Sequence, residues 1–440
     1  MAELPSANFR RYDPHQNLLL PPNLDEWLPE GHLARFIGEL VEDKIDLTPF
    51  TQGYDNATGG NLAFHPALLL KLWLYGYCVG VPSSRKVARA TFEDVAFRWL
   101  ATDQHPTYST LSRFRERNLA NFHILFRRVL KLCQEADLIG GTRMALDGTK
   151  VKANASKHKA MSHGKMLEKE KQLDEELRKS IEEYFRKVAE NDAEEDKKFG
   201  KGNNPYLGDP TIKSKKDRLE KIRRAEEAIA ERERQKAKAA GREAAPIDPK
   251  TQYNFTDPES RIMPDGANRG SFVQAYNCQA MVDEKAQIIV AAEATQAPQD
   301  QRQLVPMTEM TMANLGIVPG EILSDAGYFS EAAIRELEGR GVDVYCPPER
   351  GRKAERAECP LGRPPIDETF TQKMRRKVRS EKGRAHYGRR KCIVEPVFGQ
   401  IKQGRGLRQF LLRGLGRVRG EWDLWSLTHN ITKLHRARAT

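Results

Sequence analysis

The chain has 440 residues, a formal net charge of +12 and a pI near 9.3. This length exceeds one average domain, so we expect two or three folded units and exclude a small disulfide-held scaffold. The six cysteines show no CxxC pattern and no metal-ligand spacing, which predicts free thiols in a reducing cytoplasm rather than a zinc site. No signal-peptide core and no run of roughly 20 apolar residues is present, so we expect a cytoplasmic, nucleoid-associated protein without a membrane segment.

Most of the positive charge lies near the C-terminus. Residues 350–440 hold 24 Lys plus Arg and 8 Asp plus Glu, a net charge of +16, so the rest of the chain sums to −4. A basic block on an otherwise near-neutral chain is typical of a polyanion-binding surface, because each phosphate neutralised releases counterions. A soluble basic tail has the same composition, and both interpretations remain open.

Residues 1–135 are predicted to form helices. The stretch 65–77 begins with a proline near its start and is apolar on most faces, which predicts a buried helix. Ser83 or Ser84 can cap the next helix, after a break at residues 80–82.

A further short helix is predicted over 110–118, and it carries Arg113 and Arg115. Several short helices that end in a basic one resemble a helix-turn-helix DNA reader, so both arginines are candidate DNA contacts. Any small helical domain with surface arginines gives the same pattern.

A charged helical insertion is predicted over 157–245. Two runs with apolar residues at helical spacing are separated by a turn at 200–210, which favours an exposed hairpin of antiparallel helices inserted in the second domain. The hairpin could contact DNA, dimerise, or serve only as a solvated spacer. The apolar positions are Leu173, Leu177, Ile181, Phe185, Leu219, Ile222 and Ile229.

Residues 140–156 and the chain after residue 245 are predicted to form a mixed α/β sheet with flanking helices. A strand, a turn at Asp147–Gly148 and a second strand are expected near 143–155, and after residue 246 a hairpin is followed by strands that alternate with helices. The expected elements are strands at 271–283, 287–295, 321–325 and 342–348, helices at 303–315, 330–338 and 392–403, and a loose basic loop at 350–386.

Three acids have the chemistry of metal ligands. Asp147 and Asp325 each follow a short apolar stretch, and Glu395 lies in a predicted helix that would pack on the sheet. Two divalent cations roughly 4 Å apart, held by carboxylates, can activate a nucleophile and relieve charge on a phosphodiester. Acids at strand ends suit this role, because the strand fixes them while the next loop admits substrate. Asp283 has almost the same local pattern as Asp147, so the residues alone do not rank the two.

The resemblance to a known family is carried by the segments LDGTKVKANAS, LSDAGY and YGRRKCIVEPVFGQIKQGRGLRQFLLRGL. These resemble DDE transposases of bacterial insertion sequences, in the group whose last acid lies in a Tyr-Arg-Glu-Lys signature. DPESRIM, YNCQAMVD and RRYDPHQNLLLPPNLDEWLP resemble that group too, so the likeness covers essentially the whole chain. It implies a ribonuclease H-like catalytic domain at 140–440, an N-terminal helical DNA-recognition domain at 1–135, and catalytic Asp147, Asp325 and Glu395 that bind Mg²⁺, with Mn²⁺ as a possible substitute.

The signature departs from the family pattern at one point. Tyr387, Arg390 and Lys402 have the expected spacings to their neighbours in the motif, but the gap from Arg390 to the glutamate is one residue longer than usual. Either Arg390 contacts the phosphate from a different side of the helix, or Lys391 contacts it instead. Lysine would offer a single point charge where arginine offers two parallel hydrogen bonds. Further candidate contacts to the DNA backbone are Arg405, Arg408 and Arg413.

The resemblance implies a transposase that binds double-stranded DNA at its element's inverted repeats, cleaves there and transfers the 3′ ends to target DNA. A homodimer or larger assembly is expected, because two DNA ends must be brought together. Two alternatives stay open: a ribonuclease H-like nuclease without strand transfer, and a transposase-derived DNA-binding repressor.

Overall fold

The structure is a computed structural model in which two compact units can be described. It describes residues 23–52, 54, 63–156, 159–199, 210–239, 241–265, 268, 270–349 and 367–438. One unit runs to Asn121 and takes in the end of the last helix from His435 on, and the other spans Phe122–Leu434. The five described cysteines are free thiols, whereas Cys359 and most of the N-terminal motif RRYDPHQNLLLPPNLDEWLP lie outside the described residues.

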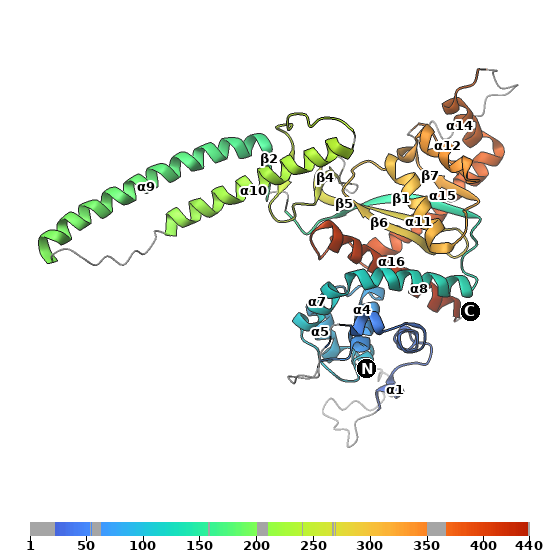
Figure 1. The fold of residues 1–440 in the computed structure, drawn as a ribbon. Coiled ribbons are helices and arrows are strands. Elements are labelled where there is room, and N and C mark those ends of the chain that lie inside the picture. The colour runs from blue at the N-terminus through green and yellow to red at the C-terminus, as the bar shows by residue number, and fades with distance from the viewer. Residues whose placement is uncertain are drawn as a thin grey trace, which may run out of the picture. The chain divides into compact units, whose positions relative to one another are not determined.

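The first unit is a cluster of short helices (Figure 1). As predicted, the helix α4 begins at Pro66, and His65 caps it by accepting a hydrogen bond from Ala67 N at 3.2 Å. Nearly every side chain of α4 is buried, in agreement with a sequence that is apolar on most faces. Ser83 precedes α5 but makes no side-chain cap bond in the described structure. The elements are α1 Leu24–Trp27, α2 Leu33–Glu39, η1 Leu40–Lys44, α3 Thr48–Thr51, α4 Pro66–Cys78, α5 Ser84–Glu93, α6 Val95–Leu100 and α7 Tyr108–Arg117.

The second unit is built on a mixed sheet. Its strands follow the order β4-β5-β1-β7-β8, with β6 also paired to β5. The strand β1 is antiparallel to β5 and parallel to β7, and β8 continues the parallel part. This agrees with the predicted α/β sheet and its hairpin. The strands are β1 Arg143–Lys152, β4 Arg261–Pro264, β5 Phe272–Asp283, β6 Ile289–Thr295, β7 Glu321–Ser324 and β8 Asp343–Tyr345.

The turn predicted at Asp147–Gly148 is wrong, because β1 runs through both residues without interruption. Gly148 pairs with Gln279 in the long antiparallel ladder with β5. Glycine often marks a turn, but at this position its missing side chain leaves room for neighbouring side chains on the sheet.

Helices surround the sheet in this unit (Figure 1). The loop predicted at 350–386 is wrong from Phe370 onward: Thr369 and Gln372 form a capping box, and Met374 and Val378 give α14 a buried face. Residues 350–366 of that prediction lie outside the described part. The helices are α8 Leu119–Glu135, η3 Gln301–Gln303, α11 Leu304–Leu315, η4 Ala326–Tyr328, α12 Glu331–Gly339, α14 Phe370–Arg379, α15 Glu381–Gly399, η5 Gln400–Gly404 and α16 Leu415–Arg438.

The helix α15 contains a proline, and a glutamine compensates for it. Pro396 has no N–H to donate to the Cys392 carbonyl one turn earlier, which would normally weaken the helix. Gln287 Nε2 donates to that carbonyl at 2.9 Å instead. The helix continues to Gly399 and changes to a π-type turn from Gln400.

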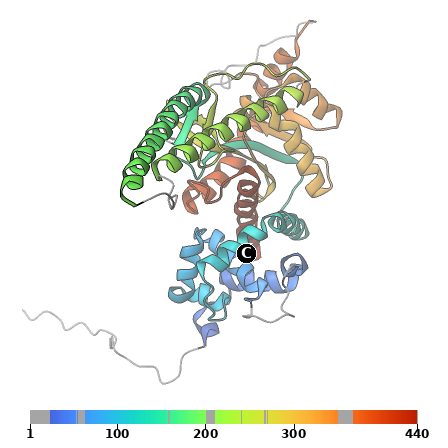
Figure 2. The ribbon, with the colours of Figure 1, turned by 60° about the vertical axis from the view of Figure 1, so that its left-hand side comes forward.

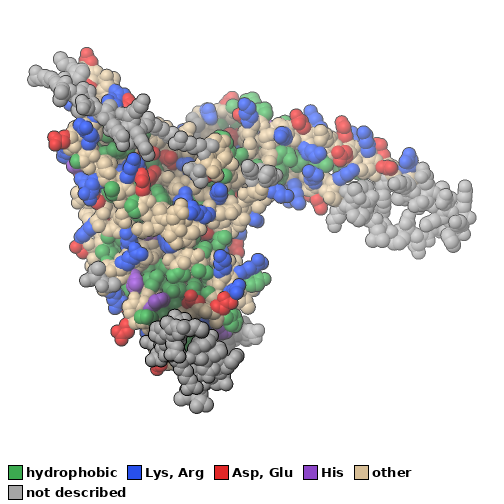
Figure 3. All heavy atoms as spheres, turned by 180° about the vertical axis from the view of Figure 1, so that it is seen from behind, with side chains coloured by type: hydrophobic (Ala, Val, Ile, Leu, Met, Phe, Trp, Pro, Cys, Tyr) green, Lys and Arg blue, Asp and Glu red, His purple; other side chains and the backbone are tan. Residues whose placement is uncertain are grey.

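Two long helices, α9 His163–Phe199 and α10 Pro210–Ala239, form the predicted hairpin (Figures 1 and 2). Lys, Arg, Asp and Glu are interspersed along its exposed surface (Figure 3), as in the pairs of Arg223 with Glu170 and Asp174. A small sheet of β2 Ala160–Ser162 and β3 Gln252–Asn254 lies at its base. The core of the hairpin, which includes four of the predicted apolar positions, consists of Met166, Leu173, Leu219, Ile222, Ala225 and Ile229.

None of the described helices combines the length and apolar composition that a membrane-spanning segment requires.

Candidate active site

The register of the sheet brings Asp147 and Asp325 together. The parallel ladder between β1 and β7 ends with the pair Leu146 and Ser324, so the two aspartates are the next residues of neighbouring strands. Neighbouring strands lie about 5 Å apart. Asp325 leaves the strand to cap η4, where its Oδ1 accepts a hydrogen bond from Gly327 N at 2.7 Å. Two acids 178 positions apart in the sequence thus share one edge of the parallel strands.

Asp147 is held in a partly buried setting. Burial raises the pKa of its carboxyl to about 6, against the lowering effect of Arg390, and the neighbouring charge of Asp325 raises it further. Its side chain remains 21% exposed, so solvent and ions can reach it. A carboxyl with this pKa is ionised at neutral pH but costs more to ionise than an ordinary surface aspartate.

Arg390 provides the counter-charge from α15. Its Nη1 donates to Asp147 Oδ2 at 3.0 Å, its guanidinium lies 5.9 Å from the ring centre of the buried Tyr387, and its buried Nε has no acceptor among the described residues. Lys391 is exposed on another side of the helix. Of the two alternatives left by the signature, the structure brings Arg390 to the aspartates. Tyr387, expected to contact DNA, is only 8% exposed and packs against Arg390 instead.

Glu395 is not joined to this pair. It lies five residues after Arg390, about 140° further around the helix, and its side chain is exposed. In the described part of the chain no hydrogen bond or ion pair links it to Asp147 or Asp325, and no group of three His, Cys, Asp or Glu side chains is close enough to hold a metal ion. The structure therefore brings together two of the three predicted acids.

Lys402, in η5, binds β1 two and three residues beyond Asp147. Its Nζ donates to Thr149 Oγ1 at 2.8 Å and to the Lys150 carbonyl at 3.4 Å. Thr149 is two residues after Asp147 and so points to the same side of the strand. Burial lowers the pKa of Lys402. This lysine therefore lies next to the aspartate pair, along β1.

A polar network around Asp300 was not predicted. Asp300 Oδ1 accepts hydrogen bonds from Lys150 Nζ at 3.1 Å, Asn277 Nδ2 at 2.6 Å and Gln279 Nε2 at 2.8 Å. Tyr328, three residues after Asp325, donates its hydroxyl to Gln279 Oε1. The network thus ties β5 to the turn that Asp325 caps. Asp300 lies in a polar loop after β6, and nothing in its local sequence distinguishes it from an ordinary loop residue.

Gly148 is required by this network. A Cβ on Gly148 would come within 2.5 Å of Gln279 Nε2 and 2.9 Å of Asp300 Oδ1, closer than side-chain atoms approach one another. The residue after Asp147 must therefore be a glycine for the network to form as it does.

Asp283 is a structural residue, although its local sequence resembles that of Asp147. It is buried, and its carboxylate accepts hydrogen bonds from Gly140 N, Gly141 N and Lys285 N at 2.9–3.0 Å. Its oxygens are thus used by the backbone of two turns, which leaves it no role as a ligand.

Two of the predicted DNA-contacting arginines are structural. Arg115 is 4% exposed, donates to Tyr77 Oη at 3.0 Å and the Pro82 carbonyl at 2.9 Å, and lies 4.4 Å from the ring centre of Trp73. Arg405 donates to Thr428 Oγ1 at 2.9 Å and lies over the ring of Trp425. Arg115 cannot face DNA from such a site, and Arg405 is held against α16. Arg113, Arg408 and Arg413 are exposed, as the prediction requires.

Two family models match the chain. One is described as a transposase domain (DUF772) and matches residues 22–117. The other is described as a transposase DDE domain and matches residues 362–435, which include Arg390, Glu395 and Lys402 but neither aspartate. No curated protein and no solved structure is detectably similar to the chain.

Proposed function

The chain is a DDE transposase of the insertion-sequence type, and on that premise we propose that it cleaves DNA at the terminal inverted repeats of its element and transfers the 3′ ends to target DNA. The observation that carries the proposal is the adjacency of Asp147 and Asp325 at the end of the β1–β7 ladder. The mixed sheet with β1 at its centre supports a ribonuclease H-like assignment of the catalytic domain.

The two aspartates suit a divalent cation. Both are hard oxygen ligands, and two neighbouring carboxylates are more easily ionised together when a cation lies between them. We assign Mg²⁺ to Asp147 and Asp325. The resemblance implies Glu395 as the third ligand, although it lies outside the pair in the described structure. A Mg²⁺ ion held there would supply Lewis-acid activation of the attacking hydroxyl and would offset charge on the scissile phosphate.

Residues around the pair have distinct roles in this proposal. Arg390 orients Asp147 through its hydrogen bond and partly balances its charge. Lys402 supplies positive charge beside the site, and Arg408 and Arg413 neutralise phosphates further along the DNA. These contacts fix the position of the duplex, whereas sequence is read from the helical unit, where Arg113 is the exposed candidate.

The proposed enzyme acts as a homodimer or larger assembly. Cleavage and joining involve two element ends, and one pair of aspartates serves one end. Crosslinking of the protein with and without DNA that carries both ends measures this state directly.

The decisive experiment is cleavage by Asp325→Asn. The DNA is a duplex that contains the terminal repeat flanking the coding region, incubated with full-length protein and Mg²⁺. The variant should lose cleavage, because a neutral amide is a poor ligand for Mg²⁺, while its affinity for the duplex stays within about twofold. Asp343→Asn is the matched control, since Asp343 begins the next parallel strand and pairs with Lys377 on the surface. Full cleavage by Asp325→Asn defeats the assignment.

One observation favours a second candidate, a transposase-derived DNA-binding protein. Glu395, the third acid, is exposed and lies outside the aspartate pair in the described structure. In that case the wild-type chain binds the terminal repeat but does not cleave it with Mg²⁺ or Mn²⁺. Cleavage that Glu395→Gln abolishes excludes this candidate. Cleavage without joining of pre-cut ends to target DNA indicates a nuclease instead.

A further inference from the structure

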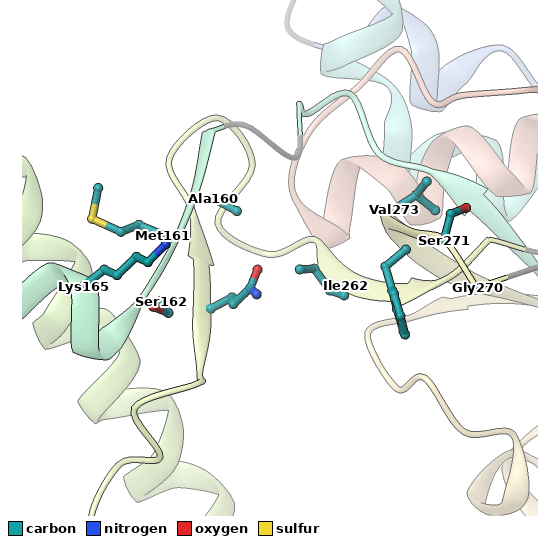
Figure 4. Close-up of a pocket in the computed structure, with 10 residues that line it drawn as sticks. Ala160, Met161, Ser162, Lys165, Ile262, Gly270, Ser271 and Val273 are labelled. Carbon is teal, nitrogen blue, oxygen red and sulfur yellow. The ribbon is translucent and has the colours of Figure 1, made fainter. Parts of the chain in front are cut away.

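A groove of about 730 Å³ lies at the base of the α9–α10 hairpin. One side is formed by β2, β3 and the start of α9, and the other by β4 and the start of β5 (Figure 4). Its size is in the range of pockets that hold a small ligand rather than a duplex. It is lined by Ala160, Met161, Ser162, Lys165, Gln252, Ile262, Gly270, Ser271, Phe272 and Val273.

The lining has the composition of a site for unpaired nucleotides. Phe272 is 56% exposed, although an aromatic side chain of this size is usually buried. Lys165 is the one charged residue among the described residues of the lining, and Ser162, Ser271 and Gln252 add polar groups. An aromatic face that can stack on any base, across a groove from a cation that can pair with a phosphate, is a combination by which proteins hold single-stranded nucleic acid.

Basic residues lie along β1 and the segment after it, between the aspartate pair and the groove. Beyond Asp147, Lys402 binds Thr149, and Lys152, on the other face of the strand, is 50% exposed and pairs with Asp265 Oδ2 at 3.8 Å. Arg413 Nε then donates to the Asn154 carbonyl at 2.8 Å, just before the segment that enters β2. Arg408 is exposed and lies close to Lys402. Burial lowers the pKa of Lys402, and the charge of Arg408 lowers it further. The exposed Arg408 and Arg413 thus add positive charge between the aspartates and the groove, which favours a polyanion there.

The sheet also sets the separation of the two sites. Ala280 on β5 is the partner of Asp147, and Phe272 is eight residues away along the same strand. Side chains an even number of residues apart point to the same side of a strand, and eight residues span about 27 Å. A nucleic-acid strand advances about 3.4 Å per nucleotide, so this length corresponds to about eight nucleotides.

We propose that this groove holds one or two unpaired nucleotides of the element-end DNA, about eight nucleotides from the scissile phosphate, with a base stacked on Phe272 and a phosphate at Lys165. The inference rests on the proposed function for the identity of the DNA. It adds a binding site for unpaired nucleotides at a fixed distance from the site of cleavage.

The first test measures binding of fluorescein-labelled deoxythymidine octamer to the full-length protein by anisotropy. Phe272→Ala should weaken binding about tenfold, because loss of base stacking has an effect of this order, while Phe272→Trp should retain it. Lys165→Gln should weaken binding and reduce the slope of log affinity against log salt by about 0.7. The matched controls are Val318→Ala, another exposed apolar residue, and Lys285→Gln at the opposite end of β5; neither should change the affinity by more than about twofold. Equal affinity of Phe272→Ala and Val318→Ala overturns the proposal.

The second test locates the unpaired nucleotides. 5-Iododeoxyuridine is placed singly at positions 3 to 14 from the cleavage point of the terminal duplex, and crosslinks to the peptide that contains Phe272 are measured after irradiation. A maximum near position 8 supports the proposal, and a flat profile or a maximum next to the cleavage point overturns it. Failure of the proposed function is distinguishable: Asp325→Asn would then leave cleavage unchanged, while octamer binding would still depend on Phe272.

Discussion

Arg390 and Asp147 lie 243 positions apart in the sequence, and Arg390 Nη1 donates to Asp147 Oδ2 at 3.0 Å. The pair fastens α15 to the central strand at the point where the parallel ladder ends. The buried face of α15 includes Tyr387, Arg390 and Val394, which leaves the glutamate of the motif on another face.

Arg390→Met is predicted to lower the free energy of unfolding by about 2 kcal/mol. Breaking a fully buried ion pair costs about 3–5 kcal/mol, and the 21% exposure of the Asp147 side chain reduces that cost here. The neighbouring Arg389→Met is the control, because the Arg389 side chain is 59% exposed in its pair with Glu284, and pairs open to solvent contribute at most about 1 kcal/mol. Urea denaturation of both variants measures the difference, and equal losses would show that Arg390 is not a structural anchor.

Gly148→Ala is predicted to destabilise the protein by about 1–3 kcal/mol, because the new methyl group would displace Gln279 and Asp300 from their network. In contrast, Gly388→Ala on α15 meets no atom within 4 Å and should be neutral or stabilising by up to about 1 kcal/mol, since alanine is the better helix former. Thermal unfolding of the two variants compares them directly. A neutral Gly148→Ala would mean that the Asp300 network does not constrain this position.

Some features of the fold follow from sequence pattern alone. The apolar spacing that predicts the hairpin includes Leu173, Leu219 and Ile222, and all three are in its core. Periodic burial over long helices is a local property, so it can be read without knowledge of the rest of the chain. The hairpin of β5 and β6 was also predictable from local sequence, because two strand-like runs lie on either side of a short polar turn.

Other features depend on partners that are distant in the sequence. Asp283 and Asp147 have similar neighbours along the chain. Three backbone amides donate to the buried Asp283, whereas Asp147 accepts from one backbone amide and from Arg390. Arg115 looked like a surface residue because its acceptors, Tyr77 Oη and the Pro82 carbonyl, are more than thirty positions away. Asp300 was missed because its network exists only once β1 and β5 pair.

The two arginines of α7 are predicted to respond differently to substitution. Arg115→Ala removes two hydrogen bonds and a contact with Trp73, so it should lower the free energy of unfolding by about 2–4 kcal/mol. Arg113→Ala should leave stability within about 0.5 kcal/mol, as exposed positions usually do, and should reduce the salt dependence of binding to the terminal duplex. Thermal unfolding and binding at several salt concentrations separate the effects. Normal stability of Arg115→Ala would contradict its structural role.

The raised pKa of Asp147 makes the stability of the folded protein depend on pH. Burial holds the pKa near 6, above the ordinary value of 3.8, so between these values the folded protein binds a proton that the unfolded chain does not. The contribution of this carboxyl to stability therefore grows as pH falls through this window and is lost as pH rises through 6. A metal ion binds the ionised carboxylate of Asp147 and therefore competes with the proton.

Affinity for Mn²⁺ is accordingly predicted to fall as pH decreases below about 6, by up to tenfold per pH unit, because each ion that binds Asp147 must displace its proton. Electron paramagnetic resonance titrations of free Mn²⁺ between pH 7.5 and 5 measure this dependence. An ordinary aspartate would lose affinity only near pH 4, so the position of the decline reports the local environment. Asp147→Asn serves as the control, since its weaker binding should not vary in that window. Constant affinity of the wild-type protein down to pH 5 would show that Asp147 is not a ligand, or that its carboxyl is not held in a buried setting.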